Sequence, residues 1–212
     1  MDAGMSERQA KKKDGRVTDT RQRILRRAEQ FYYQGGYAGI SLQELADSLH
    51  ISKAALFHHF KTKQVLFYEM LLAMLAHRQR IITEAIAQGD TASAQLRQVL
   101  RAMQECPFFD PMKFLTDEKD HLNLAQQQEI EAAFYRSIQQ PIVGALNAGI
   151  QRSELRAHHT TLSAMVFLNL MMLLPSPGHP NTRLSQHLEA EQYLDELLAF
   201  FLQGIINPQN AS

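Results

Sequence analysis

Two short helical patterns separated by a tight break are the feature that most constrains this chain. Apolar residues recur at three- and four-residue spacing over 42–49, directly behind Ser41, a residue type favoured at helix N-caps. Ser52 begins a second short pattern that runs to Phe60. Two short helices joined by so short a turn, the second polar on its outer face, have the helix-turn-helix geometry that fits the DNA major groove.

The remaining apolar patterns are also helical, and no stretch alternates as a strand does. A helix should begin at Thr18 and end at Gly35 and Gly36, and another should run from its cap Thr62 to about residue 88. We expect the fold class to be all-α. Further helices are expected around 96–103, over 125–151 with a kink at Pro141, over 160–174 and over 189–204, whereas 107–124 should be irregular or short-helical.

The charge is divided unevenly along the chain. Residues 1–64 carry twelve Lys and Arg against seven Asp and Glu, a formal +5, which leaves −5 for the remainder because the chain has no net charge. This asymmetry is typical of a nucleic-acid-facing segment joined to an acidic body. We expect a flexible basic arm at 1–17, a helix-turn-helix domain at 18–64, a second helical domain at 65–206, and a tail at 207–212.

The composition excludes several other classes of protein. A single cysteine, Cys106, rules out an intramolecular disulfide framework and fits a reducing compartment. The N-terminus lacks the apolar core of a signal peptide, and the longest apolar run, 164–174, is too short to cross a bilayer. We therefore expect a cytoplasmic protein.

The strings from Gly36 to Ala46 and from Ile51 to Lys63 closely resemble the N-terminal domain of the TetR family of transcriptional regulators. The resemblance covers about Thr18 to Leu71 without gaps. It implies a DNA-binding regulator whose recognition helix spans 53–59. The DNA-contacting residues that we expect are Ser41, Ser52, Lys53, Ala54, Ala55, Phe57, His58, His59, Lys61 and Lys63.

The chemistry of these residues agrees with the roles that the resemblance implies. Lys53 can reach a guanine edge or a phosphate, and Lys63 stands at a helix N-terminus, where backbone N–H groups also attract anions. His58 and His59 can donate to phosphate or base acceptors. Leu56 and Phe60 lie on the other side of the same helix and are expected in the core.

Three positions depart from the family pattern. Ala55 stands where a hydroxyl is usual and Phe57 where tyrosine is usual, so two phosphate hydrogen bonds are lost. Phe57 can still pack on a thymine methyl group. His50 occupies a turn position where glycine is usual, which costs strain if its φ is positive.

The C-terminal part, 65–206, resembles the family more weakly, and the resemblance implies that it is an effector-binding and dimerisation domain. There the resemblance implies that the last two helices, around 162–174 and 189–205, form a homodimer as a four-helix bundle. The apolar density of these segments exceeds what one buried face needs, which favours a partner surface.

Methionines and aromatic residues are frequent where the family builds its effector cavity. They serve either as core or as lining of a pocket among the fourth helix, the 108–114 segment and the helix bearing Phe134, and such a pocket would suit a largely apolar small molecule. The candidate ligand-binding residues are Met70, Met74, Met103, Phe108, Phe109, Met112, Phe114, Phe134, Tyr135, Met165 and Asn169.

We interpret the chain as a ligand-responsive repressor that binds a palindromic operator as a homodimer, with no cofactor and no catalysis. The alternative is a sequence-independent, nucleoid-type DNA-binding protein. The histidines at 58–59, 77, 121 and 158–159 suggest a metal site, but neighbours on a helix point about 100° apart and make poor joint ligands. Cys106 is either a redox sensor or a small buried residue, and the N-terminal lysines form either a solvated arm or a minor-groove reader.

Overall fold

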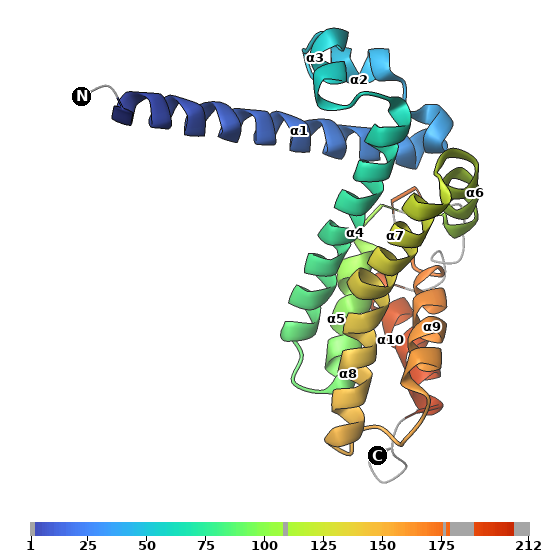
Figure 1. The fold of residues 1–212 in the computed structure, drawn as a ribbon. Coiled ribbons are helices and arrows are strands. Elements are labelled where there is room, and N and C mark those ends of the chain that lie inside the picture. Colours follow the sequence, from blue (N-terminus) through green and yellow to red (C-terminus); the bar gives the residue numbers. More distant parts are fainter. Residues whose placement is uncertain (1–2, 108–109, 176, 179–188, 206–212) are drawn as a thin grey trace. The chain divides into compact units, whose positions relative to one another are not determined.

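The computed structural model describes residues 3–107, 110–175, 177–178 and 189–205, and side chains within these ranges except at 3–18, 111–112 and 190. The regular secondary structure of the described residues is helical throughout, which confirms the all-α class. The elements, shown in Figure 1, are α1 (Ala3–Gly39), α2 (Leu42–Ser48), α3 (Lys53–His59), α4 (Lys63–Ala87), α5 (Ala92–Gln104), α6 (Pro111–His121), α7 (Leu124–Phe134), the π-helical turn η1 (Tyr135–Gln139), α8 (Gln140–Gln151), α9 (Thr160–Met171) and α10 (Ala190–Gln203).

The helices form two compact units. Unit 1 contains α1, α2, α3, the start of α4 through Met74, and the segment Pro111–Gln127. Unit 2 contains the rest of α4, the chain up to Asp110, and the chain from Gln128 onward. The division therefore falls inside α4, whereas the sequence suggested a boundary at residue 64. A division into compact units does not assign functions, and the functional limits 18–64 and 65–206 stay a prediction.

The helix starts of unit 1 follow the side chains that the sequence marks as caps. The hydroxyl of Ser41 accepts the N–H of Glu44 at 3.4 Å, and that of Ser52 accepts the N–H of Ala55 at 3.1 Å. Thr62 caps α4 in the same way. These bonds satisfy backbone donors that the first helical turn leaves open, so α2, α3 and α4 begin where the sequence predicts.

The turn between α2 and α3 has a left-handed backbone at His50, where strain was expected if φ were positive. His50 has a φ of 55°, a conformation that glycine adopts without cost and that other residues adopt with strain. Leu56 and Phe60 are 0% and 1% exposed, which confirms their assignment to the core. They pack in unit 1, whose buried side chains also include Ile24, Ala28, Leu45, Leu66 and Phe67.

Helix α1 is interrupted where the sequence predicts its end but begins earlier than expected. Gly36 interrupts it with φ 66° and ψ −157°, as expected for a helix-ending glycine, before a last turn to Gly39. At the other end α1 begins at Ala3 and not at Thr18, so it includes most of the segment 1–17, whose flexibility as a basic arm stays a prediction. The difference has a physical basis, because nine of residues 1–17 are Ala, Lys, Arg, Gln or Glu, which favour helix, and a helix already formed at Thr18 propagates more readily than a new one nucleates.

The C-terminal helices follow the predicted pattern, with one local difference. The expected helix over 125–151 is present as α7, η1 and α8, and its irregularity is the π-helical turn just before Pro141. Proline has no N–H to donate and its ring clashes with the carbonyl four residues earlier, which a wider turn relieves. Helix α6 forms where an irregular or short-helical segment was expected.

Unit 2 joins α5 to α10 through charged side chains as well as apolar ones. The guanidinium of Arg97 pairs with Glu191 and with Asp195, each at 2.7 Å. Leu96, Val99, Leu146, Phe167 and Leu194 are fully buried in the same unit. Among the described residues, no helix combines the length and the hydropathy that spanning a bilayer requires.

Candidate nucleic-acid interface

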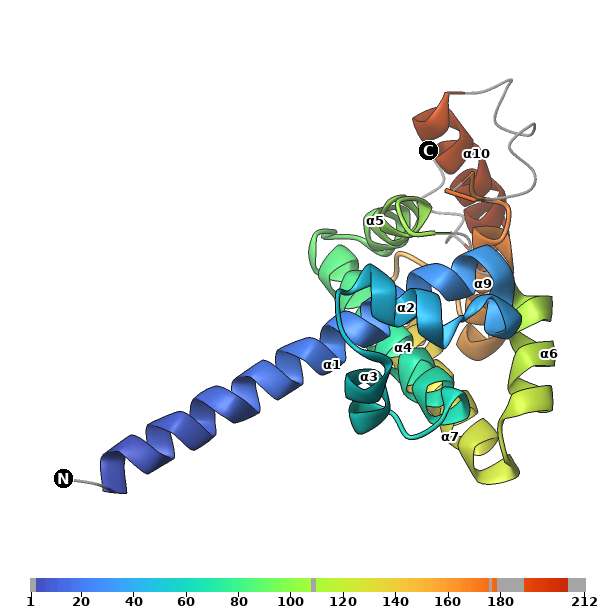
Figure 2. The same ribbon diagram turned by 90° about the horizontal axis from the view of Figure 1, so that it is seen from above.

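Helix α3 presents a short polar surface whose orientation is fixed by the burial of Leu56. Its exposed side chains are those of Lys53, Ala54 and His58, with the cap Ser52 also exposed. Ala55, Phe57 and His59 are half-buried. Figure 2 shows α3 beside α2 in unit 1. The predicted recognition helix thus turns several of its assigned residues to solvent, while Phe57 and His59 lie partly inside.

This surface carries positive charge without a nearby carboxylate in the sequence. No Asp or Glu occurs from Ser48 to Tyr68, a stretch that includes Lys53, Lys61 and Lys63. The rings of His58 and His59 meet edge to face, with centroids 5.7 Å apart. Burial lowers the pKa of His59, and the neighbouring His58 and Arg21 lower that pKa further. A bound phosphate would act in the opposite direction, because it favours the imidazolium.

The hydroxyls of Ser41 and Ser52 are already engaged in hydrogen bonds within the protein. Each accepts a backbone N–H as a helix cap. A hydroxyl that accepts a hydrogen bond still has its own proton to donate. Both side chains can therefore hold a helix start and donate to a phosphate oxygen together.

Lys63 lies over an aromatic ring. Its Nζ is 4.4 Å from the ring centroid of Tyr37, a cation–π contact. Burial lowers the pKa of Lys63, and the carboxylate of Asp117 acts in the opposite direction. The phosphate contact assigned to Lys63 stays a prediction. In this structure the Lys63 ammonium group is positioned by its contact with the Tyr37 ring.

Tyr37 is a positioning residue that sequence reasoning missed. Its backbone N–H donates to Asp117 of α6 at 2.9 Å, and its ring stacks on His121. The ring also meets Phe67 of α4 edge-on at 5.0 Å. Within unit 1, Tyr37 thus joins the end of α1 to α4 and α6, although α6 lies about 80 residues further along the chain, and no local pattern indicates that pairing.

Two arginines counted in the basic N-terminal region are occupied inside unit 1. Arg27 donates from Nε to the hydroxyl of Ser48 at 3.1 Å, which braces α2 against α1. Arg21 forms an ion pair with Glu69, and its guanidinium lies 4.5 Å from the ring centroid of Phe60. Part of the positive charge therefore holds the helix-turn-helix together.

The candidate effector residues are divided between the two units. Met70, Met74 and Phe114 are buried in unit 1. In unit 2, Met103 and Phe134 are half-buried and Tyr135 is exposed. Phe108 and Phe109 lie outside the described residues, as does the side chain of Met112. A pocket formed jointly by these residues stays a prediction.

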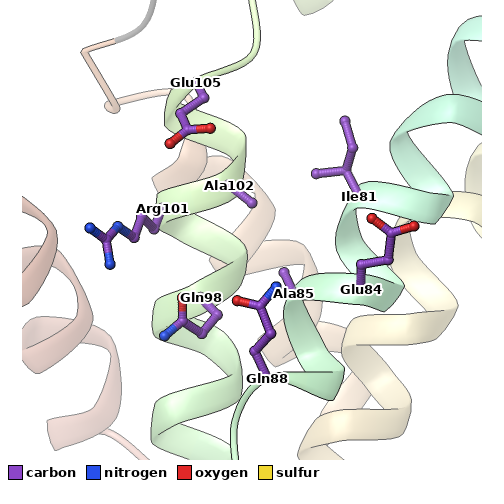
Figure 3. A pocket seen from close by; sticks show the side chains of 8 residues that line it. All are labelled: Ile81, Glu84, Ala85, Gln88, Gln98, Arg101, Ala102 and Glu105. Carbon is purple, nitrogen blue, oxygen red and sulfur yellow. The ribbon is translucent and has the colours of Figure 1, made fainter.

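A hollow in unit 2 lies between α4 and α5 and was not expected from the sequence. It measures about 340 Å³, and polar side chains dominate its lining. In Figure 3, Arg101 points away from α4, in agreement with its ion pair to Glu191. The lining residues are Ile81, Glu84, Ala85 and Gln88 of α4, with Gln98, Arg101, Ala102 and the following Glu105 on the α5 side.

Helix α9 exposes an apolar stripe. Leu162, Met165 and Val166 are each about half exposed, at the spacing of one helix face. Asn169 lies on the same stripe and donates its amide to the carbonyl of Met165. Met165 and Asn169, assigned to the effector pocket from sequence, therefore lie on an exposed surface of the single chain. Among the large apolar residues whose side chains the structure describes, Phe200 of α10 is the most exposed, at 72%.

Several histidines that suggested a metal site make local contacts instead. His159 caps α9 by accepting the N–H of Leu162, and His158 lies 2.7 Å from the carbonyl of Arg156. His121 stacks on Tyr37. In the part of the chain that the structure describes, no three His, Cys, Asp or Glu side chains gather as metal ligands would. Cys106 is half-buried, with its thiol directed at the carbonyl of Ala102.

Part of this chain matches a known family model and several curated proteins. Residues 24–70 match the model of the bacterial regulatory proteins, tetR family. Over 72 residues, 34% of this chain, the sequence is 31% identical to the HTH-type transcriptional repressor NemR of Escherichia coli (strain K12). The chain spans less than half the length of the curated relatives it matches, 36% in the case of NemR.

Solved structures share the fold over most of the chain. A TetR-family transcriptional regulator from Agrobacterium tumefaciens has a TM-score of 0.69 at 19% identity, covering 90% of this chain and 100% of that one. AibR, solved with isovaleryl coenzyme A and operator DNA, has a TM-score of 0.61 at 21% identity, covering 86% and 97%. At such identities the likeness shows the fold alone.

Proposed function

The chain belongs to the TetR family of bacterial regulatory proteins, and from this premise we propose that it is a ligand-responsive transcriptional repressor. It binds a palindromic operator as a homodimer and leaves it when a small, largely apolar effector binds. The observation that carries the proposal is the presentation of α3. Ser52 caps this helix, Leu56 fixes its rotation, and Lys53 and His58 face solvent in a stretch without carboxylates.

The proposed DNA contacts divide into base reading and phosphate anchoring. Lys53, at the start of α3, reaches a guanine edge or a phosphate in the major groove. Lys63 and the hydroxyl of Ser41 contact phosphates, which fix register without reading sequence. Phe57 packs on a thymine methyl group, and the imidazoles of His58 and His59 donate to nearby acceptors.

The exposed stripe of α9 and the exposed Phe200 of α10 support a homodimer through the last two helices. A large apolar surface is costly to leave in water, and a two-fold axis lets the same patch of two copies cover itself. The dimer would present two recognition helices to two half-sites of one operator.

We propose that the effector is apolar or has a long apolar portion. The methionine and aromatic residues assigned to it supply flexible lining with few charges. AibR, a structural neighbour, was solved with an acyl thioester and operator DNA, which supports a small-molecule effector for this fold. Release requires only that the effector bind the DNA-free conformation more tightly than the DNA-bound one.

A second candidate function is sequence-independent binding of DNA, of the kind that nucleoid proteins carry out. The basic character of residues 1–64 would serve either function. Both place the protein in the cytoplasm with DNA, and neither involves catalysis. The two differ in whether the operator is preferred over scrambled DNA.

The test compares two lysine variants on an operator duplex and on a scrambled duplex by fluorescence anisotropy. Lys63→Ala should weaken both about equally and reduce the salt slope by about one, because it removes a single phosphate contact, whereas Lys53→Ala should reduce the preference for the operator. Lys119→Ala, an exposed lysine of α6, is the control. Equal affinity of the unaltered protein for both duplexes would favour the nucleoid-type function.

The effector is tested by thermal shift and by operator release. The compounds are fatty acids, acyl thioesters, aromatic hydrophobes, sugars and metal ions. Release by an apolar member of this set is the expected result. Release by sugars or metal ions alone would contradict the proposed effector class while leaving the DNA-binding function intact.

A further inference from the structure

Helix α1 extends far beyond the residues that pack it into unit 1. Its first buried side chain among those described is Ile24, followed by Ala28 and Tyr32. Since α1 begins at Ala3, about 30 Å of helix precedes Ile24 at the usual rise per residue. Figures 1 and 2 both show this stretch extending away from α2 and α3.

The helical geometry of this extension places several basic positions of the sequence on one side of it. Counted at about 100° per residue, five basic positions fall within about 80° of one another around the helix axis, and one acidic position, Asp19, falls among them. Two of the five, Arg23 and Arg26, have described side chains, and both are exposed. We call these positions the basic stripe, formed by Arg8, Lys12, Arg16, Arg23 and Arg26.

The basic stripe lowers the stability of the helix when no partner is bound. Arg8, Lys12 and Arg16 follow one another at i, i+4 spacing, where like charges destabilise an isolated helix. External negative charge along the helix would remove this repulsion. A DNA backbone provides such charge in a regular row, and neutralising it releases condensed counterions, which drives binding.

The opposite side of the extension is unsuited to a membrane. Its positions hold Glu7, Ala10, Asp14 and Val17, which offer no bulky apolar face. A helix that lies in a membrane surface needs such a face for its affinity. Among polyanions that meet a helix of this length, duplex DNA is therefore the partner that fits.

We propose that the basic stripe of α1 is a second DNA-binding element, which lies along the phosphates of the DNA flanking the half-site that α3 reads. This inference rests on the proposed operator-binding function. The stripe reads no sequence and adds affinity by charge alone. It extends the contacted DNA by up to about nine base pairs on each side, from a helix of about 30 Å and a rise of about 3.4 Å per base pair.

The test uses the full-length protein and two duplexes, one cut to the two half-sites and one extended by about ten base pairs on each side. A stripe variant carries Arg8→Gln, Lys12→Gln and Arg16→Gln. A control variant removes the same charge elsewhere, with Arg80→Gln, Lys119→Gln and Arg136→Gln, all exposed. The unaltered protein and the control should bind the long duplex about ten-fold more tightly than the short one.

The stripe variant should lose this preference for the long duplex, and its salt slope on that duplex should be shallower by about two to three, because three phosphate contacts are removed. Equal binding of both duplexes by the unaltered protein, or a stripe variant that behaves as the control, would overturn the inference while leaving operator binding intact. Failure to prefer the operator over scrambled DNA on the short duplex would instead refute the proposed function, and the inference with it. Stripe-dependent binding to phosphatidylserine vesicles, without a flank effect on DNA, would overturn it in favour of a membrane.

Discussion

The ring of Tyr37 stacks on the imidazole of His121, with centroids 3.6 Å apart and an angle of 21° between the planes. The backbone N–H of Tyr37 donates to Asp117 one turn earlier in α6. Two separate contacts therefore hold α6 against the end of α1, directly after the left-handed Gly36. The attachment of α6 within unit 1 depends on the backbone conformation of that glycine.

Gly36→Ala should destabilise the protein by about 1–3 kcal/mol, because alanine pays for a positive φ and its Cβ would meet α6. A Cβ at this position would overlap Cε of Lys113 and would lie 2.7 Å from a carboxylate oxygen of Asp117. Gly35→Ala is the matched control, since nothing lies within 4 Å of its Cβ and helical alanine is favoured. Urea unfolding of both variants measures the difference, and equal midpoints would contradict this account.

The helix-turn-helix could be predicted closely because its determinants are local. Ser41, Ser52 and Thr62 act within three residues of themselves, so the sequence alone indicates where α2, α3 and α4 begin. The φ of His50 is positive, which is the condition under which its departure from the usual glycine was expected to cost strain. Local hydrogen bonding and backbone preference decide these features, and both can be read without tertiary contacts.

The contacts that position α6 could not be predicted, because they join residues distant in sequence. Nothing near Tyr37 indicates that its partners are Asp117 and His121. The π-helical turn before Pro141 is similar, since proline predicts an irregularity there but not its form. Met165 illustrates a different limit, because an apolar residue on a helix suits a pocket, a core or a partner surface equally well until its exposure is known.

Phe57→Tyr should tighten operator binding by about 0.5–1.5 kcal/mol if its ring edge faces the DNA backbone, because the added hydroxyl can donate to a phosphate oxygen. Phe57 is half-buried on α3, so its ring lies at the border of the exposed surface. Phe57→Leu keeps an apolar side chain without a hydroxyl and should not tighten binding. Anisotropy titrations at one salt concentration compare the three proteins, and weaker binding by the tyrosine variant would show that the ring faces inward.

The lowered pKa of His59 predicts opposite pH dependences for stability and for DNA binding. Burial, His58 and Arg21 lower this pKa below its usual value, so the unfolded chain takes up the proton more readily. The contribution of His59 to stability is therefore present above about pH 6.5 and is lost as the pH falls through the folded-state pKa. DNA phosphate favours the imidazolium, so operator affinity should rise over the same fall in pH.

His59→Gln should flatten both pH dependences, measured as urea midpoints and as operator Kd between about pH 7.5 and pH 5.5. His77→Gln, at an exposed position of α4, is the control and should leave both curves as they are in the unaltered protein. A decline in stability that persists unchanged in His59→Gln would assign the effect to other groups.

Phe200→Glu should convert the proposed homodimer to a monomer, because it places a charge in the centre of the proposed interface. Leu124→Glu is the matched control, since Leu124 is 70% exposed and Phe200 is 72% exposed, but Leu124 lies at the start of α7. Sedimentation at micromolar concentration distinguishes the two. A dimer that survives Phe200→Glu but not Leu124→Glu would move the interface to another surface.

Selection of bound duplexes from a random DNA pool, using the full-length protein, tests the central claim most directly. A two-fold dimer that reads DNA with α3 should enrich a near-palindrome whose half-sites are about one helical turn, roughly 34–36 Å, or a modest extension of it apart. Repeating the selection with Lys53→Ala should relax the preference at a base position within each half-site. A pool that stays random, or one that enriches a single asymmetric site, would contradict the account of this chain as a dimeric operator-binding regulator.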